Sequence, residues 1–208
     1  MDDEPYGGGA GMVLRVEPFV QCLESIQNNP VFEHSKKGRV LMTAADGRLY
    51  NQSFARELAS EEHLIILCGH FKGIDERVSK WVDDKISIGD FVLSGGEIPA
   101  MVIVDSIARL LPGVVSDRAS VETDSHYNGL LGAPCYTRPP EFRGETVPDI
   151  LRSGHTRKIE EYQFLESVKR TAETRPDLLD QYQFSKEEKK LLKKYGLEEL
   201  CQVPTKTR

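Results

Sequence analysis

Residues 86–115 decide the fold of this chain, with the sequence ISIGDFVLSGGEIPAMVIVDSIARLLPGVV. The apolar run at 86–93 predicts a short strand, which a Gly-Asp pair beginning at Gly89 interrupts. A Gly-Gly turn follows, and 97–111 has the continuous apolar character of a mostly buried helix. A Pro-Gly pair ends this helix. The stretch therefore predicts a strand, a glycine turn and a helix in succession.

The same alternation of strands and helices extends toward the N-terminus. Residues 39–44 and 64–68 are apolar runs that predict two more buried strands. Amphipathic patterns at 17–28 and 52–62 predict helices before each of them. Strands that alternate with helices in this way are typical of a parallel sheet with crossover helices. We therefore assign the N-terminal part to the α/β class.

The pattern changes after the helix of the opening stretch. Residues 114–126 are polar without a helix or strand period, and 128–150 are dense in glycine and proline. Helices return at 155–174 and at 185–196, where Ser185 and Glu188 form a capping-box pattern. We therefore divide the chain into an α/β domain, a flexible linker and a small helical C-terminal domain, at residues 1–115, 116–126 and 127–208.

Composition excludes several classes of protein. The chain of 208 residues is 39% apolar and 29% charged, which is typical of a globular protein. It has no apolar run long enough to span a membrane, and its acidic, glycine-rich start lacks the features of a signal peptide. Four cysteines form no C-x-x-C pair, so we interpret them as buried small apolar residues. We expect a cytoplasmic protein with no membrane partner.

The charge is unevenly distributed along the chain. Residues 1–140 hold 13 Lys and Arg against 20 Asp and Glu, and residues 141–208 hold 14 against 13. The first part therefore has a net charge of −7 and the second of +1, which add to the −6 of the whole chain. A polyanion such as nucleic acid would be bound by the second part rather than by a general positive field.

Three glycine-bearing turns each follow a predicted strand, at 44–47, 69–73 and 88–96. Ligands of parallel α/β sheets bind at the carboxyl ends of the strands, so these turns could line one pocket for a flat heterocycle. From spacing alone, ordinary tight turns are the favoured interpretation. The glycine run at 7–11 is no phosphate loop, because no Gly-Lys-Ser/Thr follows it.

Two charged residues stand out without a clear structural duty. Arg109 lies near the end of an otherwise apolar helix, where it could catalyse or could simply complement the helix dipole. Asp124 lies in the polar linker, where a solvated loop carboxylate is the plain alternative. The pattern of residues alone favours the structural interpretation for both side chains.

The opening stretch, together with four others, resembles the bacterial tRNA (guanine-N1)-methyltransferase family. These other stretches are DDEPYGGGAGM, GHFKGIDERV, YTRPPEFRG and VPDILRSGH, at residues 2–12, 69–78, 136–144 and 147–155. The five motifs follow the family order from Asp2 to about residue 176. The family belongs to the knotted (SPOUT) RNA methyltransferases that use S-adenosylmethionine.

The resemblance implies a fold, a cofactor and partners. The α/β domain is expected to carry a deep trefoil knot built from 39–47, 64–73 and 86–96, and to hold S-adenosylmethionine. It is expected to form a homodimer with each active site at the interface, and the helical domain to grip the anticodon arm of tRNA. The residues that match the cofactor-binding positions of the family, and are therefore expected to contact the donor, are Gly69, Ile88, Gly89, Asp90, Phe91, Val92, Leu93, Gly95 and Gly96. Magnesium is left open, and no residue is assigned as a metal ligand.

The resemblance also implies the reaction, which forms N1-methylguanosine at tRNA position 37. Guanine N1 carries a proton, so a base must remove it while negative charge builds on O6. The matching family positions make Asp124 the general base and Arg109 the cation that stabilises the O6 charge. An aspartate in water is a weak base. A linker that orders on tRNA would therefore strengthen it by excluding water.

Three alternatives to this reaction are kept. A knotted RNA methyltransferase with another target nucleotide is disfavoured by the pair Asp124 and Arg109, because 2′-O methylation has no O6 charge to stabilise. An inactive, truncated RNA-binding protein would fail to bind S-adenosylmethionine. An unrelated phosphate-binding α/β enzyme lacks a lysine-bearing glycine loop.

The sequence departs from the family pattern at several places. Met1 falls inside a family motif, and members normally have about 45 further residues, whose absence would leave an unpaired sheet edge. We expect a wrongly set start or a trimmed chain. Lys72 stands where the family often has an acidic residue, and Phe91 where tyrosine is more usual. Residues 43–47 replace the usual Ser-Pro-Gln-Gly.

Overall fold

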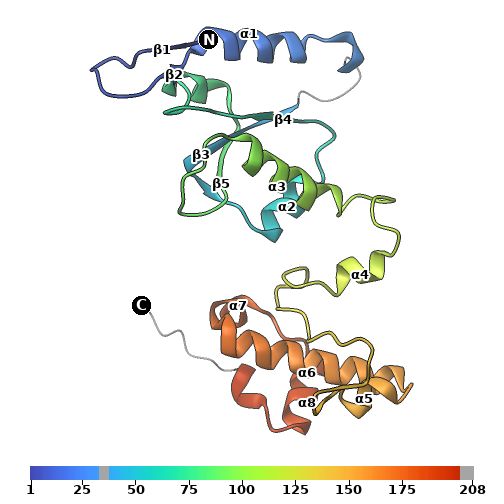
Figure 1. Cartoon of the computed structure of the whole chain (residues 1–208). Coiled ribbons are helices and arrows are strands. Elements are labelled where there is room, and N and C mark those ends of the chain that lie inside the picture. The colour runs from blue at the N-terminus through green and yellow to red at the C-terminus, as the bar shows by residue number, and fades with distance from the viewer. Residues whose placement is uncertain (33–37, 202–208) are drawn as a thin grey trace. The chain divides into compact units, whose positions relative to one another are not determined.

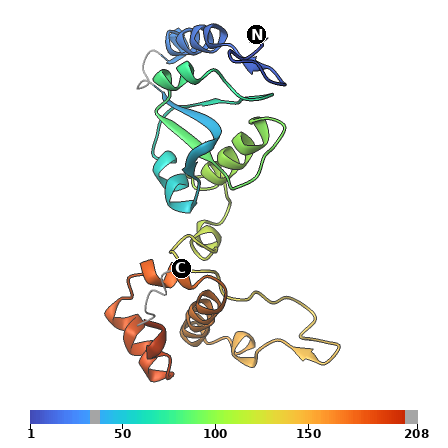
Figure 2. The same cartoon turned by 90° about the vertical axis from the view of Figure 1, so that its left-hand side faces the viewer.

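The computed structural model describes residues 1–32 and 38–201 of the chain. It divides the chain into two compact units, Met1–Ser116 and a second that begins at Asp117. The first unit is α/β and the second is mainly helical (Figures 1 and 2).

Three parallel strands form the main sheet of the first unit. They are β3 (Arg39–Leu49), β4 (Leu64–Leu67) and β5 (Asp84–Ser87), in the spatial order β4-β3-β5. Residues Arg39 to Met42 pair in register with Leu64 to Leu67 on one side. On the other side Leu41 pairs with Asp84. The predicted parallel sheet is therefore confirmed, with the longest strand at its centre.

Helices cover both faces of this sheet, because alternate side chains of β3 point to opposite faces. Val40 and Met42 lie in one core cluster with Leu23 of α1 (Val16–Gln27). Leu41 lies in a second cluster with residues of α2 (Gln52–Leu58) and α3 (Glu97–Ala108). Figure 1 shows α1 on one side of the strands and α2 and α3 on the other. The sheet is thus the middle layer of three.

Two boundaries of the predicted strands are wrong. The strand expected at 86–93 begins at Asp84 and ends at Ser87, because Gly89 takes a positive φ of 147° that no strand tolerates. The turn expected at 44–47 lies inside β3, where the pairing shifts so that Thr43 and Arg48 both oppose Ile86. Residues 44–47 therefore bulge out of the sheet without ending the strand.

A short N-terminal hairpin is attached to the loop that follows β4. It pairs β1 (Asp2–Asp3) with β2 (Val13–Leu14), and its connection contains the glycine run. The Leu14 nitrogen donates to the Gly73 oxygen over 2.9 Å, and the Lys72 nitrogen donates to the Met12 oxygen over 3.0 Å. The unit also contains two 3₁₀ helices, Pro30–Phe32 and Glu76–Trp81. The glycine loop is therefore held beside residues 70–75.

The second unit is built on one long helix, α6 (Thr156–Thr174). Its core contains Leu165 and Val168 of α6 with Leu130, Leu179 and Leu192 from other segments. The predicted helix at 155–174 and the Ser185–Glu188 capping box are both confirmed. The remaining elements are α4 (Arg118–Glu122), β6 (Glu141–Phe142), β7 (Glu145–Thr146), α5 (Asp149–Arg152), α7 (Pro176–Gln181), α8 (Lys186–Lys194) and a 3₁₀ helix, Glu198–Cys201.

Two smaller expectations also need correction. The segment 114–126 was expected to lack regular structure, yet it contains α4, whose Val121 is buried. The cysteines are not core residues, because Cys22 and Cys135 are exposed and Cys68 and Cys201 are half-buried.

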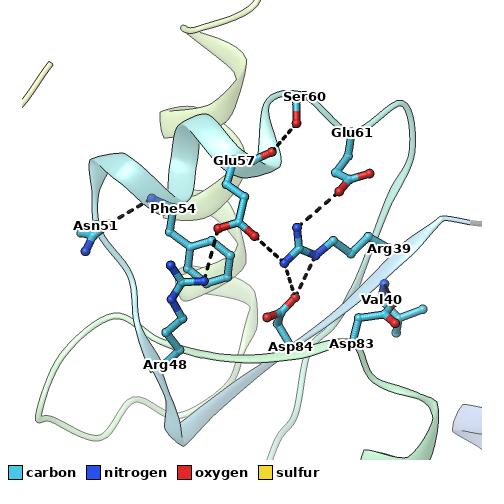
Figure 3. Close-up of polar contacts among 10 residues, drawn as sticks. All are labelled: Arg39, Val40, Arg48, Asn51, Phe54, Glu57, Ser60, Glu61, Asp83 and Asp84. Carbon is cyan, nitrogen blue, oxygen red and sulfur yellow. Dashed lines mark hydrogen bonds and ion pairs between the residues drawn. The ribbon is translucent and has the colours of Figure 1, made fainter.

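An arginine network ties the sheet to α2 (Figure 3). The Arg39 guanidinium donates from Nε to Asp84 Oδ2 over 2.8 Å and from Nη2 to Glu57 Oε1 over 2.7 Å. Arg48 donates to the other oxygen of Glu57, and its guanidinium lies 3.9 Å from the centre of the Phe54 ring. The network thereby connects β3, β5 and α2 around a fully buried aromatic ring.

We predict that Arg39→Met lowers the free energy of unfolding by about 1–2 kcal/mol, because half-buried Asp84 loses its charged partner. The hydrogen bond from Arg39 also holds the pKa of Glu57 below its ordinary value of 4.5. A lowered pKa stabilises the fold above that value, and this contribution is lost as the pH falls below it. Urea titrations of both proteins between pH 3 and 7 measure the effect.

The difference in stability between the wild type and Arg39→Met should therefore shrink toward acidic pH. Arg15→Met is the control, because Arg15 pairs over 3.5 Å with an exposed Glu17, and surface pairs contribute little. Equal losses in the two variants at pH 7 would contradict a structural role for the Arg39 network.

Candidate functional site

The three turns singled out in the sequence meet at the carboxyl ends of the strands. Because the strands are parallel, the segments that follow them lie at the same end of the sheet. Together they line a cavity of about 430 Å³, which is the size of a small-molecule site. Ordinary unrelated turns would not converge in this way, so the pocket interpretation is the one that the geometry supports.

Most of the predicted cofactor contacts line this cavity. Asp90 is the exception, because it is exposed and is not part of the cavity wall. Side chains that the sequence analysis did not single out also contribute, among them Thr43, Asp46, Glu76 and Lys85. The predicted residues in the wall are Gly69, Ile88, Gly89, Phe91, Val92, Leu93, Gly95 and Gly96.

A close backbone contact closes the cavity on one side. The Gly96 nitrogen donates to the Gly69 oxygen over 2.7 Å, and His70 forms an isolated bridge with Gly95. A Cβ atom on Gly96 would lie 2.8 Å from the Gly69 nitrogen and 2.9 Å from the Cys68 Cα. Only glycine fits at this position. β5 and β4 are the two outer strands of the sheet. The segment that follows β5 therefore passes over the end of β3 and reaches the C-terminal end of β4.

The loop after β4 holds a strained residue at the cavity. Phe71 takes a positive φ of 58°, which is uncommon for a bulky side chain. Its nitrogen donates to His70 Nδ1 over 2.9 Å, and the two rings meet edge to face at 4.7 Å. Phe71 remains exposed at the cavity wall. Strained residues of this kind are often found at ligand sites.

The charged side chains of the cavity are partly neutralised. Lys85 Nζ lies 3.1 Å from Asp46 Oδ2 and 3.0 Å from Glu76 Oε1. The hydrogen bond from Lys85 lowers the pKa of Glu76, and the same bond raises the pKa of Lys85. Glu76 and Lys85 therefore both remain charged near neutral pH.

The cysteine at the end of β4 is not a nucleophile at neutral pH. Burial raises the pKa of the Cys68 thiol, and the negative charge of Glu97 raises it further. A thiol with a raised pKa stays protonated and is unreactive. Among the described residues, no group of three or more His, Cys, Asp or Glu side chains is placed to hold a metal ion.

The two proposed catalytic residues belong to different units. Arg109 directly follows α3 in the first unit, where its nitrogen donates to the Asp105 oxygen over 3.2 Å. Asp124 lies just after α4 in the second unit, and its nitrogen donates to the Val121 oxygen over 3.3 Å. Both side chains are exposed. Neither unit alone contains the pair.

The second unit has a hollow of its own between α6 and α8. It has a volume of about 570 Å³, and its wall contains Ile150, Leu165, three basic side chains, two tyrosines and Glu161, which pairs with Arg157 and Lys194. The basic side chains and the tyrosines are Arg157, Lys158, Lys194, Tyr162 and Tyr195. Basic and aromatic side chains in one place suit contacts to a phosphate backbone and to bases. Within the described parts of the chain, no helix is long and apolar enough to cross a membrane.

Comparison with known proteins gives a consistent result. Residues 1–181 match the model of the family described as tRNA (Guanine-1)-methyltransferase TrmD. A tRNA (guanine-N(1)-)-methyltransferase of Desulforamulus reducens is 51% identical over 193 residues, which are 92% of this chain and 75% of that protein. That of Shouchella clausii is 52% identical over 194 residues, 93% of this chain and 78% of that protein.

Proposed function

Because the chain belongs to the tRNA (guanine-N1)-methyltransferase family, we propose that it transfers a methyl group from S-adenosylmethionine to N1 of guanine 37, next to the anticodon of tRNA. The observation that carries the proposal is the cavity at the carboxyl edge of the sheet. Its wall contains eight of the nine cofactor positions that the family motifs assign.

The cavity has the properties that a nucleoside donor requires. Its wall contains Gly69, Gly95 and Gly96, so that main-chain groups can come close to a heterocycle. Apolar side chains, among them Ile88 and Leu93, provide surface for a flat ring. The donor supplies a methyl group on a sulfonium, which needs positioning rather than covalent help. The residues present therefore fit this donor.

In the proposed reaction, Asp124 and Arg109 act on the guanine. The Asp124 carboxylate accepts the N1 proton, which frees the nitrogen lone pair for the new N–C bond. Arg109 stabilises the negative charge that builds on O6 as the proton leaves. The methyl–sulfur bond breaks in the same step, and its electrons remain on sulfur. We assign no residue and no step to magnesium.

We propose that the second unit binds the anticodon arm of the tRNA. The hollow between α6 and α8 supports this role, because Lys158 lines it together with Arg157 and Lys194, which share Glu161 as their partner. Cations placed in this way attract phosphates, and the two neighbouring tyrosines offer faces for bases. Arg109 and Asp124 belong to separate units, so tRNA bound to both would bring them to one nucleotide.

We further propose that the first unit is knotted. The strand order supports this arrangement, because the chain leaves β5 at one edge of the sheet and returns to the end of β4 at the other. The contact of Gly96 with Gly69 marks the point of return. A knot is a rare exception to the rule that chains avoid threading.

A homodimer is the last part of the proposal. Helix α3 exposes an apolar face that includes Ile98, Met101, Val102 and Val104, and Met101 is 70% exposed. A monomer gains nothing from such a face, whereas a second copy would bury it. Since Arg109 directly follows the same helix, the interface would lie close to the proposed catalytic cation.

We predict that Met101→Glu converts the dimer into a monomer and lowers turnover at least about tenfold, because a charge cannot be buried at an apolar interface. Sedimentation velocity at several protein concentrations measures the assembly. Val31→Glu is the matched control, since Val31 is also apolar and exposed but lies far along the chain from α3. A wild-type protein that sediments as a monomer would contradict the dimer.

Two measurements on the wild-type chain test the function itself. Calorimetric titration with S-adenosylmethionine should show one site per chain, and a tRNA transcript with guanine at position 37 should accept one methyl group. A transcript with adenine at position 37 is the control. Donor binding without guanine methylation would favour another target nucleotide. No donor binding would favour the RNA-binding protein without activity.

A further inference from the structure

Four charged side chains line the cavity of the first unit, and only three of them neutralise one another. Asp46, Glu76 and Lys85 form one cluster through the two contacts of the Lys85 ammonium. This cluster has a net charge of −1, from two carboxylates and one ammonium. Lys72, the fourth, forms no ion pair with any residue in the described parts of the chain.

The side chain of Lys72 is positioned by its surroundings. Its backbone nitrogen donates to the Met12 oxygen, which holds residue 72 against the glycine loop. A Cβ on Gly11 would lie 3.0 Å from Lys72 Cγ, and one on Gly9 would lie 3.6 Å from Lys72 Nζ. The absence of side chains at these two glycines leaves a channel for the lysine stem. Lys72 therefore runs along the loop as part of the cavity wall.

The charges of the donor determine what a lysine can do at this place. At neutral pH S-adenosylmethionine has two cationic groups, the sulfonium and the ammonium, and a single carboxylate. A lysine ammonium repels the first two and forms a strong hydrogen bond with the third. The Asp46–Glu76–Lys85 cluster has the opposite net charge and suits a cation. The cavity wall thus contains one cation outside the cluster and one cluster of net negative charge, and the amino-acid portion of the donor carries the same two signs.

We propose that the Lys72 ammonium binds the carboxylate of the donor's amino-acid portion and so selects donors that carry it. This inference rests on the proposed function, since it concerns the same cavity. It assigns a specificity role to a residue that stands where the family often has an acidic one. Lys72 acts in binding and takes no part in the transfer of the proton or the methyl group.

Calorimetry with two ligands tests this role. S-adenosylmethionine and its decarboxylated form differ by the carboxylate alone, and both retain the sulfonium and the ammonium. Lys72→Met should weaken binding of S-adenosylmethionine about tenfold, because one charge-assisted hydrogen bond is lost. It should leave the affinity for the decarboxylated ligand unchanged or improve it, because a repelling cation is removed. Lys72→Arg should retain the wild-type preference.

Two further variants complete the experiment. Lys80→Met is the matched control, because Lys80 is exposed and does not line the cavity. Its affinity for both ligands should equal that of the wild type. Lys72→Glu reverses the charge and should bind the decarboxylated ligand in preference to S-adenosylmethionine. Thermal melting checks that every variant is folded.

The outcomes separate this inference from the proposed function. If Lys72→Met binds S-adenosylmethionine as tightly as the wild type, or loses the same factor for both ligands, the carboxylate contact is wrong while donor binding stands. If the wild type binds neither ligand, the proposed function fails as well. If Lys72→Met instead weakens tRNA binding and lowers its salt dependence, Lys72 contacts a phosphate and the inference is overturned.

Discussion

Replacement of Asp124 by alanine is expected to lower methyl transfer by about 10²–10⁴-fold, because the transferred methyl group needs a nitrogen lone pair that a proton occupies. Binding of S-adenosylmethionine should change by no more than a few-fold. Asp124 lies in the second unit and is not part of the cavity wall in the first. Single-turnover assays with tRNA and calorimetry with the donor measure the two effects separately.

Asp124→Asn is the sharper variant, because it retains the shape and removes only the ability to accept a proton. Glu122→Gln is the control, since it removes another exposed carboxylate only two residues away, at the end of α4. Near-normal turnover of Asp124→Asn would show that this residue is not the base.

The change Arg109→Ala should lower turnover about 10²–10³-fold, because the negative charge on O6 loses its stabilising cation. An unchanged rate would show that Arg109 only complements the dipole at the end of its helix.

Replacement of Gly96 by alanine is expected to abolish donor binding and to lower the free energy of unfolding by about 1–3 kcal/mol. The new methyl group would meet backbone atoms of Cys68 and Gly69, which cannot rotate away as a side chain can. The chain must then separate the loop after β5 from the loop after β4. Since both loops form the cavity wall, turnover should fall about 100-fold or more.

Gly196→Ala separates the two consequences of the Gly96 change. Gly196 lies in the second unit with a positive φ of 68°, and no atom lies within 4 Å of the added Cβ. Alanine there strains the backbone, so it should cost stability while donor binding is retained. Calorimetry and urea unfolding of both variants test this difference. Normal donor affinity of Gly96→Ala would show that the contact with Gly69 does not shape the cavity.

The sequence predicted the parallel sheet because apolar runs and glycine turns are local signals. It did not predict the bulge at 44–47, since the shift of β3 against Ile86 is a pairing between segments far apart in the chain. The end of β5 at Ser87 was missed because the residues that follow remain apolar. These residues line the cavity and do not pair in the sheet.

In the candidate site too, local signals were predicted from the sequence and long-range contacts were not. Glycine spacing and family motifs led to the loops at 69–73 and 88–96, which do meet in the structure. Glu76 and Lys85 were missed, because only the fold brings these two side chains to the cavity. Asp90 was assigned by motif alone, and the turn at Gly89 leaves it outside the wall. The roles of Asp124 and Arg109 remain predictions.

The hydrogen bond between Gly69 and Gly96 also sets an order of events during folding. It joins residues 27 positions apart, and the cavity beside it also needs the pairing of β3 with β5, in which Leu41 and Asp84 are 43 positions apart. Contacts of long sequence separation are slow to form because loop closure must precede them. The cavity should therefore be among the last features to mature on refolding. A donor that binds in the cavity would therefore bind only the fully folded chain. It would also protect the chain from proteases, and more strongly as the donor concentration rises.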